Sequence, residues 1–235
     1  MSKILITGAN KGIGREAARQ LVAAGHTVYL GSRDAERGRR AAEQVGAQPI
    51  QIDITDDASV AAAVHTLENE GGLDVLVNNA GMQNEMRPDG SVLGAADLTA
   101  DMMRETFDTN VFGTVRVLHA FLPLLQKSGS PVIVNVASGL ASLARATTPG
   151  PGYDYPGVAY RSSKTAVNVL TIEYAKAFPG IRINSVEPGY TKTDLNFDNG
   201  AQSVEEAAAI IVRMAQIGAD GPTGGFFGND GPLPW

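Results

Sequence analysis

The sequence predicts a doubly wound α/β fold, in which helices cover both faces of a parallel sheet. Two observations predict it. Short apolar runs bounded by turn residues recur along the chain, which is typical of strands buried on both faces. Longer stretches with apolar residues three and four positions apart lie between these runs, and such stripes are typical of helices. Strands that alternate with helices imply right-handed crossovers and a parallel sheet.

Six apolar runs are the candidate strands, and we expect a sheet of about seven strands with helices on both faces. In chain order the runs are Ile4 to Thr7, Thr27 to Leu30, Pro49 to Ile52, Leu73 to Val77, Val132 to Val136 and Ile181 to Val186.

Helical stripes follow several of these runs. The stripe of Ile13, Ala17 and Leu21 predicts a helix that begins near Arg15. Asp34 suits the N-cap of a helix that starts at Ala35, because its side chain can accept from a backbone N–H of the first turn. For the same reason, Asp56-Asp57 suits the start of the helix that runs through Val64.

Composition is that of a packed protein, and it excludes several chemistries. The 235 residues include 43% hydrophobic and 19% charged residues, and no composition shift marks a boundary, so we expect one domain over residues 1–235. The absence of cysteine excludes disulfides, thiolate nucleophiles and thiolate-bound metal centres. The three histidines, His26, His65 and His119, lack metal-ligand spacing, so no metal site is predicted.

Charge and hydropathy indicate the setting in which the protein works. The formal net charge of −6 opposes a general role on nucleic acid or on an anionic membrane, because both need a positive field. No apolar run approaches the ~18 residues of a spanning helix, and the first residues lack the pattern of a signal peptide. We therefore expect a cytoplasmic protein that acts on a small molecule.

A glycine-rich turn follows the first predicted strand and reads Thr7-Gly8-Ala9-Asn10-Lys11-Gly12-Ile13-Gly14. Glycines at such a turn let backbone N–H groups and the positive helix N-terminus approach a pyrophosphate. The spacing differs from G-x-G-x-x-G, and no Gly-Lys-Ser/Thr follows, which argues against a P-loop ATPase. A plain glycine-rich turn remains an alternative if the spacing is taken alone.

Tyr160 and Lys164 are candidates for acid–base chemistry, because residues at positions i and i+4 of a helix share a face. Hydride transfer between a nicotinamide and a carbonyl carbon leaves a negative oxygen, which needs a proton donor and a hydrogen-bond donor. An ammonium beside a phenol stabilises the phenolate and lowers its pKa.

In the order of its motifs the chain resembles the short-chain dehydrogenase/reductase family. The matching residues are the glycine turn Thr7 to Gly14, Asp53-Ile54, Asn78-Asn79-Ala80-Gly81, Asn110, Ser138, Tyr160 with Lys164, and Pro188-Gly189. The resemblance covers almost the whole chain and implies a Rossmann fold.

The resemblance also implies a catalytic role for four residues. Tyr160 is expected to be the general acid/base, and Ser138 to position the substrate oxygen. Lys164 is expected to bind the nicotinamide ribose and to lower the pKa of Tyr160. The backbone carbonyl of Asn110 is expected to hold a water that links Lys164 to solvent.

The cofactor-binding residues follow from the same resemblance. We expect Gly8, Asn10, Lys11, Gly12, Ile13 and Gly14 at the phosphates, Asp53 and Ile54 at the adenine, Asn79, Ala80 and Gly81 beside the glycine turn, Tyr160 and Lys164 at the nicotinamide ribose, and Pro188, Gly189, Thr191 and Thr193 at the nicotinamide end.

Cofactor choice depends on the end of the second strand. Counting ~20 residues from the glycine turn points to Asp34, and hence to NAD. Aligned to the family, however, the acidic position of NAD-users falls on Ser32, with Arg33 beside it and Lys11 in the glycine turn. That pattern resembles carbonyl-reductase-like members that prefer NADPH over NADH, and Arg37 could assist with the phosphate.

Two irregular segments, Thr147 to Val158 and Gly189 to Ser203, follow strands at their carboxyl ends, where open α/β sheets bind ligands. We expect Ser138, Tyr153, Tyr155, Tyr160, Tyr190 and Leu195 to bind the substrate. The first segment is intermediate in length between those of oligomeric and monomeric relatives, so a homodimer, a homotetramer and a monomer all stay open.

The predicted function is the NADPH-dependent reduction of a small ketone or aldehyde, which in reverse is an alcohol dehydrogenase reaction. Two alternatives stay open: an ene reductase of the same family, and a regulator or redox sensor that binds NADP(H) without turnover.

Overall fold

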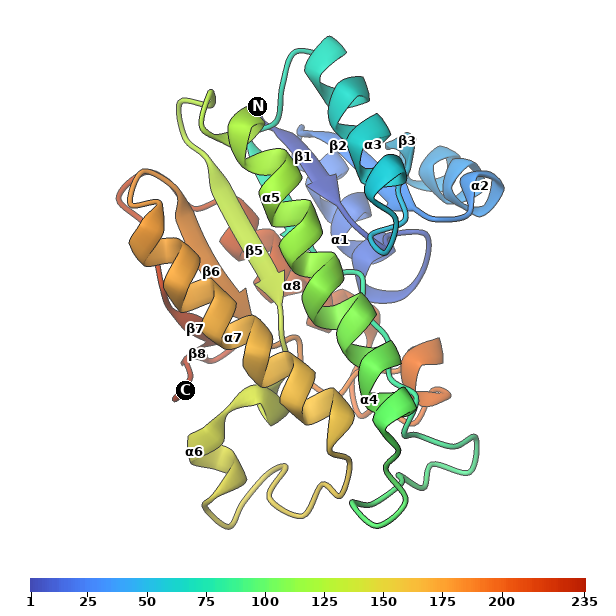
Figure 1. Cartoon of the computed structure of the whole chain (residues 1–235). Coiled ribbons are helices and arrows are strands. Elements are labelled where there is room, and N and C mark those ends of the chain that lie inside the picture. Colours follow the sequence, from blue (N-terminus) through green and yellow to red (C-terminus); the bar gives the residue numbers. More distant parts are fainter.

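One twisted sheet lies between two layers of helices (Figure 1). The computed structural model describes residues 1–235. The sheet has eight strands in the order β3-β2-β1-β4-β5-β6-β7-β8, and all neighbours are parallel except β7 and β8. The strands are β1 (Lys3–Ile6), β2 (Thr27–Ser32), β3 (Gln48–Gln51), β4 (Val75–Asn78), β5 (Val132–Val136), β6 (Arg182–Val186), β7 (Phe226–Gly228) and β8 (Gly231–Pro232).

The main helices divide between the two faces of the sheet. One face packs against α1 (Gly12–Ala23), α2 (Ala35–Val45) and α8 (Val204–Ala215). The other packs against α3 (Asp57–Asn69), α5 (Thr114–Leu125) and α7 (Ala159–Ala177). Helix α4 (Ala100–Phe107) continues through a π-helical turn, η1 (Asp108–Gly113), into α5. The remaining short elements are η2 (Gly139–Ala141), α6 (Leu143–Ala146) and η3 (Asp194–Asn196).

The core consists of one large apolar cluster on each face of the sheet. Consecutive strand residues point to opposite faces, so Ile4 and Ile6 belong to one cluster and Leu5 to the other. All three are fully buried, and burial of one such side chain contributes about 1.5–3 kcal/mol. Apolar residues on both sides of each strand explain why the strands read as continuous apolar runs.

The six predicted strands are confirmed, with ends that differ by at most two residues. The eighth strand was not expected, because Gly231–Pro232 is two residues long and carries no apolar run. Helix α1 begins at Gly12, earlier than Arg15, since the last two glycines of the turn form its first turn. Asp34 is confirmed as an N-cap: its carboxylate accepts from the Arg37 N–H at 2.9 Å.

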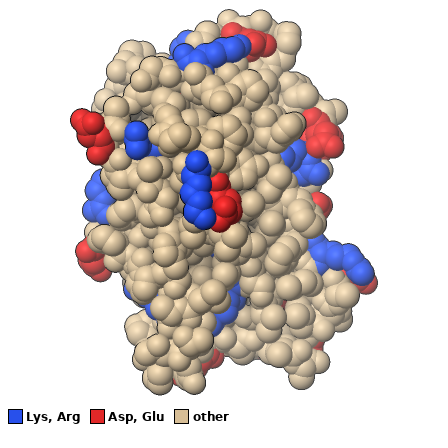
Figure 2. Space-filling model, turned by 60° about the vertical axis from the view of Figure 1, so that its left-hand side comes forward, with Lys and Arg blue, Asp and Glu red and all other residues tan.

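Asp56 caps α3 as expected and accepts from the N–H groups of Ala58 and Ser59. No helix is both long and apolar enough to cross a membrane. Figure 2 shows one face of the molecule, where basic and acidic side chains lie scattered and often next to one another on a largely uncharged surface.

The strand order reverses between β1 and β4, which is the usual ligand position in this architecture. The loops that follow the strands gather at their carboxyl ends, at the lower edge of the sheet in Figure 1.

Candidate active site

The glycine turn after β1 packs directly on the loop after β4. Gly8 has φ +61°, and a Cβ there would lie 2.8 Å from the Cα of Ala80. A Cβ on Gly14 would lie 2.4 Å from Nδ2 of Asn79. Both positions therefore exclude a side chain, and Gly8 also needs the left-handed backbone that glycine adopts at low cost.

Asn79 joins the two loops through hydrogen bonds. Its Nδ2 donates to the carbonyls of Thr7 at 2.8 Å and Gly8 at 3.1 Å. In return, the Thr7 hydroxyl accepts from the N–H groups of Asn79 and Ala80, both at 3.1 Å. Ile13 packs against the apolar cluster beneath the turn. The motif residues therefore build a rigid corner at the reversal of the strand order.

The N-terminus of α1 fits the pyrophosphate of a dinucleotide. Its N-cap residue, Lys11, makes no side-chain capping bond, and no acidic residue lies in the first turn. The first N–H groups of a helix have no partner within the helix and favour an anion. Gly12, with φ +57°, leaves the approach to this helix end free of a side chain.

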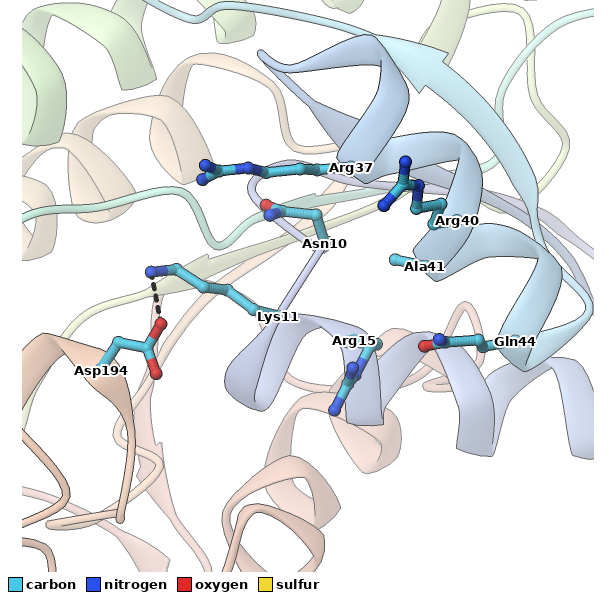
Figure 3. A pocket seen from close by; sticks show the side chains of 8 residues that line it. All are labelled: Asn10, Lys11, Arg15, Arg37, Arg40, Ala41, Gln44 and Asp194. Carbon is cyan, nitrogen blue, oxygen red and sulfur yellow. Dashed lines mark hydrogen bonds and ion pairs between the residues drawn. The ribbon is translucent and has the colours of Figure 1, made fainter.

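A pocket of about 250 Å³ opens between α1 and α2 (Figure 3). Its basic lining residues are Lys11, Arg15, Arg37 and Arg40, and the others are Asn10, Ala41, Gln44 and Asp194. The Lys11 ammonium lies 2.8 Å from the Asp194 carboxylate, which comes from the loop after β6. In Figure 3, the Arg37 side chain extends alongside Asn10. The pocket thus combines a positive field with the glycine turn.

Arg33 and Ser32, the expected residues at the end of the second strand, lie outside this pocket. Arg33 is not among the residues that line the pocket. Ser32 is buried, and its hydroxyl donates to the Asp34 carbonyl at 2.9 Å. Arg37, in the first turn of α2, does line the pocket, and its guanidinium also pairs with the Asp34 carboxylate at 3.3 Å.

Asp53 and Ile54 follow β3, as the motif requires. Burial alone would raise the pKa of Asp53, but hydrogen bonds from Thr55 and the nearby charge of Arg33 hold that pKa below its usual value. Ile54 is buried, and a Cβ on Gly113 would lie 2.8 Å from its Cδ1. One oxygen of the Asp53 carboxylate accepts from the Thr55 N–H and hydroxyl, and its expected contact with the adenine stays a prediction.

Ser138, Tyr160 and Lys164 come together between β5 and α7. Tyr160 is the second residue of α7, and its buried phenol lies near the Ser138 side chain, which opposes the rise in its pKa. The Lys164 Nζ lies one turn further, 5.8 Å from the centre of the Tyr160 ring, and donates to the Val136 carbonyl at 2.8 Å. A hydroxyl pair with an ammonium beside it can hold an oxygen and move a proton to it.

Burial controls the ionisation of this group. It raises the pKa of Tyr160 to about 12, although the Ser138 hydrogen bond opposes the rise and the charge of Glu187 adds to it. Burial also lowers the pKa of Lys164 to about 8. Desolvation of the phenol is the largest cause of the Tyr160 shift, and the Lys164 ammonium bonds to the Val136 carbonyl. The lowering of the Tyr160 pKa by Lys164 stays a prediction.

Asn110 lies in the π-helical turn η1, a feature often found at functional sites. Its side chain accepts from the Met82 N–H at 2.8 Å, donates to the Met82 carbonyl at 2.9 Å, and donates to the Ser163 hydroxyl at 3.0 Å. A Cβ on Gly81 would lie 3.3 Å from both Asn110 Oδ1 and Lys164 Nζ, so Asn110 adjoins the catalytic group.

The backbone carbonyl of Asn110 accepts from the Thr114 hydroxyl at 2.8 Å. A carbonyl oxygen has two lone pairs, so a second partner such as water is compatible with this bond.

The loop after β6 carries the remaining residues that the family motif predicts to contact the cofactor. Gly189 has φ +91°, and its carbonyl accepts from the Thr191 hydroxyl at 3.0 Å. The Pro188 carbonyl accepts from Nε2 of Gln202. Thr193 reaches the glycine turn, since its Cγ2 would lie 3.5 Å from a Cβ on Gly12.

Among the expected substrate residues, Tyr155 lies near both Tyr160 and Tyr190. Burial raises the pKa of Tyr155, and the charges of Glu85, Tyr160 and Tyr190 raise it further. The Tyr155 hydroxyl accepts from Nε2 of Gln83 at 3.1 Å. Tyr153 and Leu195 are exposed on the flanking loops and share no hydrogen bond with Tyr160.

Two carboxylates were missed by sequence reasoning. Glu187, the last residue before Pro188, is partly buried, and this burial raises its pKa while the nearby charge of Arg145 lowers it. Its place directly after a buried strand is a signal that could have found it. Glu85 is 1% exposed and bonds to the start of α7. It belongs to no motif, so only the tertiary structure reveals it.

The chain is similar to known dehydrogenases and reductases over most of its length. The family model described as short chain dehydrogenase matches residues 2–203. The chain is 36% identical to (−)-isopiperitenone reductase of Mentha piperita, over 97% of this chain and 96% of that protein. It is 32% identical to (+)-neomenthol dehydrogenase of Capsicum annuum, over 95% of this chain and 94% of that protein.

Among solved structures, salutaridine reductase from Papaver somniferum superposes with a TM-score of 0.83 and 29% identity, over 97% of this chain and 100% of that chain. The chain therefore belongs to the short-chain dehydrogenase/reductase family and is an oxidoreductase that acts on alcohol or carbonyl groups.

Proposed function

We propose that the protein reduces a small ketone or aldehyde with NADPH and catalyses the reverse alcohol oxidation. The observation that carries this proposal is the buried group of Ser138, Tyr160 and Lys164, which lies at the carboxyl edge of the sheet. The uncapped start of α1 lies at the same edge and fits a dinucleotide.

When bound, the reduced nicotinamide supplies the hydride. Tyr160 donates its proton to the carbonyl oxygen, which gains negative charge as the carbon accepts the hydride. The Ser138 hydroxyl hydrogen bonds to the same oxygen and holds it beside the phenol. Lys164 binds the nicotinamide ribose, and its ammonium stabilises the phenolate that remains.

The basic pocket supports NADPH over NADH. Lys11 and Arg37 line it together with Asn10, and a 2′-phosphate is a divalent anion that such a field favours. Asp34, the residue that would argue for NADH, is engaged as the cap of α2 and as the partner of Arg37. Arg33 stays a predicted second contact, beside Asp53.

A second candidate is the reduction of a carbon–carbon double bond conjugated to a carbonyl. The similarity to an isopiperitenone reductase favours it.

The intact Tyr160 and Lys164 favour turnover over the third possibility, a sensor that only binds NADP(H). The half-exposed Tyr190 and the partly buried Tyr155 ring favour an apolar substrate. A cytoplasmic location and the oligomeric state stay predictions, and size-exclusion chromatography with light scattering tests the latter.

The test is the oxidation of NADPH and of NADH in the presence of aliphatic, aryl, cyclic and α,β-unsaturated carbonyls, followed by product analysis. We expect NADPH consumption with an alcohol product. Saturated ketone as the product would favour the second candidate. NADPH binding without any turnover would refute both.

A further inference from the structure

The proposed reaction requires a fixed position of Tyr160, and a buried carboxylate outside the catalytic group holds the backbone that carries it. Glu85 lies in the segment after β4 and is 1% exposed. Its Oε1 accepts from the N–H groups of Val158 at 2.6 Å and Ala159 at 2.8 Å. Its Oε2 accepts from the N–H of Tyr160 at 2.8 Å.

These bonds supply what the local sequence lacks. The first N–H groups of a helix have no partner within it, and a neighbouring polar side chain usually caps them. Val158 occupies the N-cap of α7 and has no side-chain acceptor. Ala159 and Tyr160 are buried, so their N–H groups would otherwise lack a partner. A carboxylate at the positive end of a helix is also favoured electrostatically.

The same segment reaches α7 from a second direction. Met82 is held on both its N–H and its carbonyl by the Asn110 side chain. Asn110 also donates to the Ser163 hydroxyl, which donates to the Tyr160 carbonyl at 2.8 Å. The first turn of α7 is thus bonded to Glu85 through its N–H groups, and the Tyr160 carbonyl is linked to Met82 through Ser163 and Asn110.

We infer that Glu85 is a positioning residue for Tyr160. Its carboxylate fixes the first turn of α7, so that the phenol stays in register with the Ser138 hydroxyl and the substrate oxygen. The inference rests on the proposed function, because it concerns the proton donor of that reaction. The required precision is high: a displacement of about 1 Å can cost about 10²-fold in rate.

The test compares Glu85→Gln and Glu85→Ala with Glu173→Gln. The control makes the same charge change on the exposed side of α7, where Glu173 pairs with Lys176 at 2.8 Å. We expect kcat for carbonyl reduction to fall about tenfold in Glu85→Gln and about 10²-fold in Glu85→Ala. The control should keep the wild-type kcat.

Two further measurements separate positioning from a loss of folded protein. With NADPH deuterated at the transferred position, the isotope effect on kcat should rise in the Glu85 variants, because a misaligned site slows the chemical step. Without cofactor, hydrogen exchange at the amides of residues 158–160 should accelerate, while the amides in the middle of α7 stay protected. A smaller folded fraction would lower the rate without changing the isotope effect.

Wild-type kcat in both Glu85 variants would overturn the inference, as would a lower kcat with an unchanged isotope effect and faster exchange along the whole chain. If the wild-type protein reduces no carbonyl, the proposed function fails instead. The exchange measurement then still decides whether Glu85 holds the first turn of α7.

Discussion

Tyr160 combines a buried phenol with a hydroxyl and an ammonium nearby, and its pKa of about 12 keeps it protonated at neutral pH. Tyr160→Phe removes the hydroxyl that carries the transferable proton but keeps the aromatic ring. We expect kcat for reduction to fall by about 10²–10⁴-fold, the usual contribution of a general acid. NADPH affinity, measured by fluorescence titration, should stay within about twofold because no cofactor phosphate contact is removed.

Tyr174→Phe is the matched control, since Tyr174 lies on the same helix and packs on Phe178 with ring centres 6.0 Å apart. It should keep full activity. Substantial turnover by Tyr160→Phe would mean that another group donates the proton.

Lys164 makes the folded state less stable at neutral pH. Its pKa of about 8 lies below the unfolded value near 10.5, so at pH 7 the fold holds a buried charge at a cost of about 3 kcal/mol. Between pH 8 and 10.5 the unfolded chain binds more protons than the folded one. The free energy of unfolding therefore increases as the pH rises through this range, and above it the cost of the buried charge is no longer present.

Lys164→Met should therefore unfold at higher urea concentration than the wild type at pH 7. We expect a gain of about 2 kcal/mol, because the Val136 carbonyl loses its donor at a cost of about 1 kcal/mol. The gain should disappear by pH 10. An advantage of the same size at pH 7 and pH 10 would show that the buried charge is not its cause.

Two of the three arginines of helix α2 line the pocket. Arg37 and Arg40 line the pocket, whereas Arg39 pairs with Glu36 and Glu43. We expect Arg37→Ala to raise the KM for NADPH about tenfold, the effect of one lost charge-assisted hydrogen bond, with little change for NADH. Arg33→Ala should act in the same direction.

Arg39→Ala serves as the control and should leave both KM values unchanged. Steady-state kinetics with each cofactor, at low and at high salt, measures these effects. Equal changes in the KM for NADPH and the KM for NADH in Arg37→Ala would show that the pocket does not bind the 2′-phosphate.

The elements and their caps could be predicted because the information is local. Buried parallel strands require apolar residues on both faces, and Asp34 and Asp56 cap helices within three residues of themselves. The motif residues at the ends of β1, β4, β5 and β6 could be placed at one edge of the sheet, because each follows a predicted strand and the carboxyl ends of parallel strands lie at the same edge.

The remaining features arise from tertiary contacts. Glu85 reaches the start of α7 across 73 residues or more of sequence, and no local pattern marks it. The direction of the Tyr160 pKa depends on how deeply the phenol is buried, which the spacing of Tyr160 and Lys164 does not reveal. The turn of η1 at Asn110 needs the bonds to Met82 and Ser163.

As a whole, the molecule has a layer of helices on each face of one sheet, and the loops after β1, β4, β5 and β6 lie at one edge of that sheet (Figure 1). We propose that at this edge hydride passes to a carbonyl carbon while Tyr160 supplies the proton.

The most direct test reduces an α,β-unsaturated ketone with NADPH deuterated at the transferred position and locates the deuterium by NMR. We predict deuterium on the carbon that bears the new hydroxyl, and formation of this product about 10²–10⁴-fold slower with Tyr160→Phe. Deuterium on the β carbon of a saturated ketone, or no transfer to any carbonyl compound, would contradict the account.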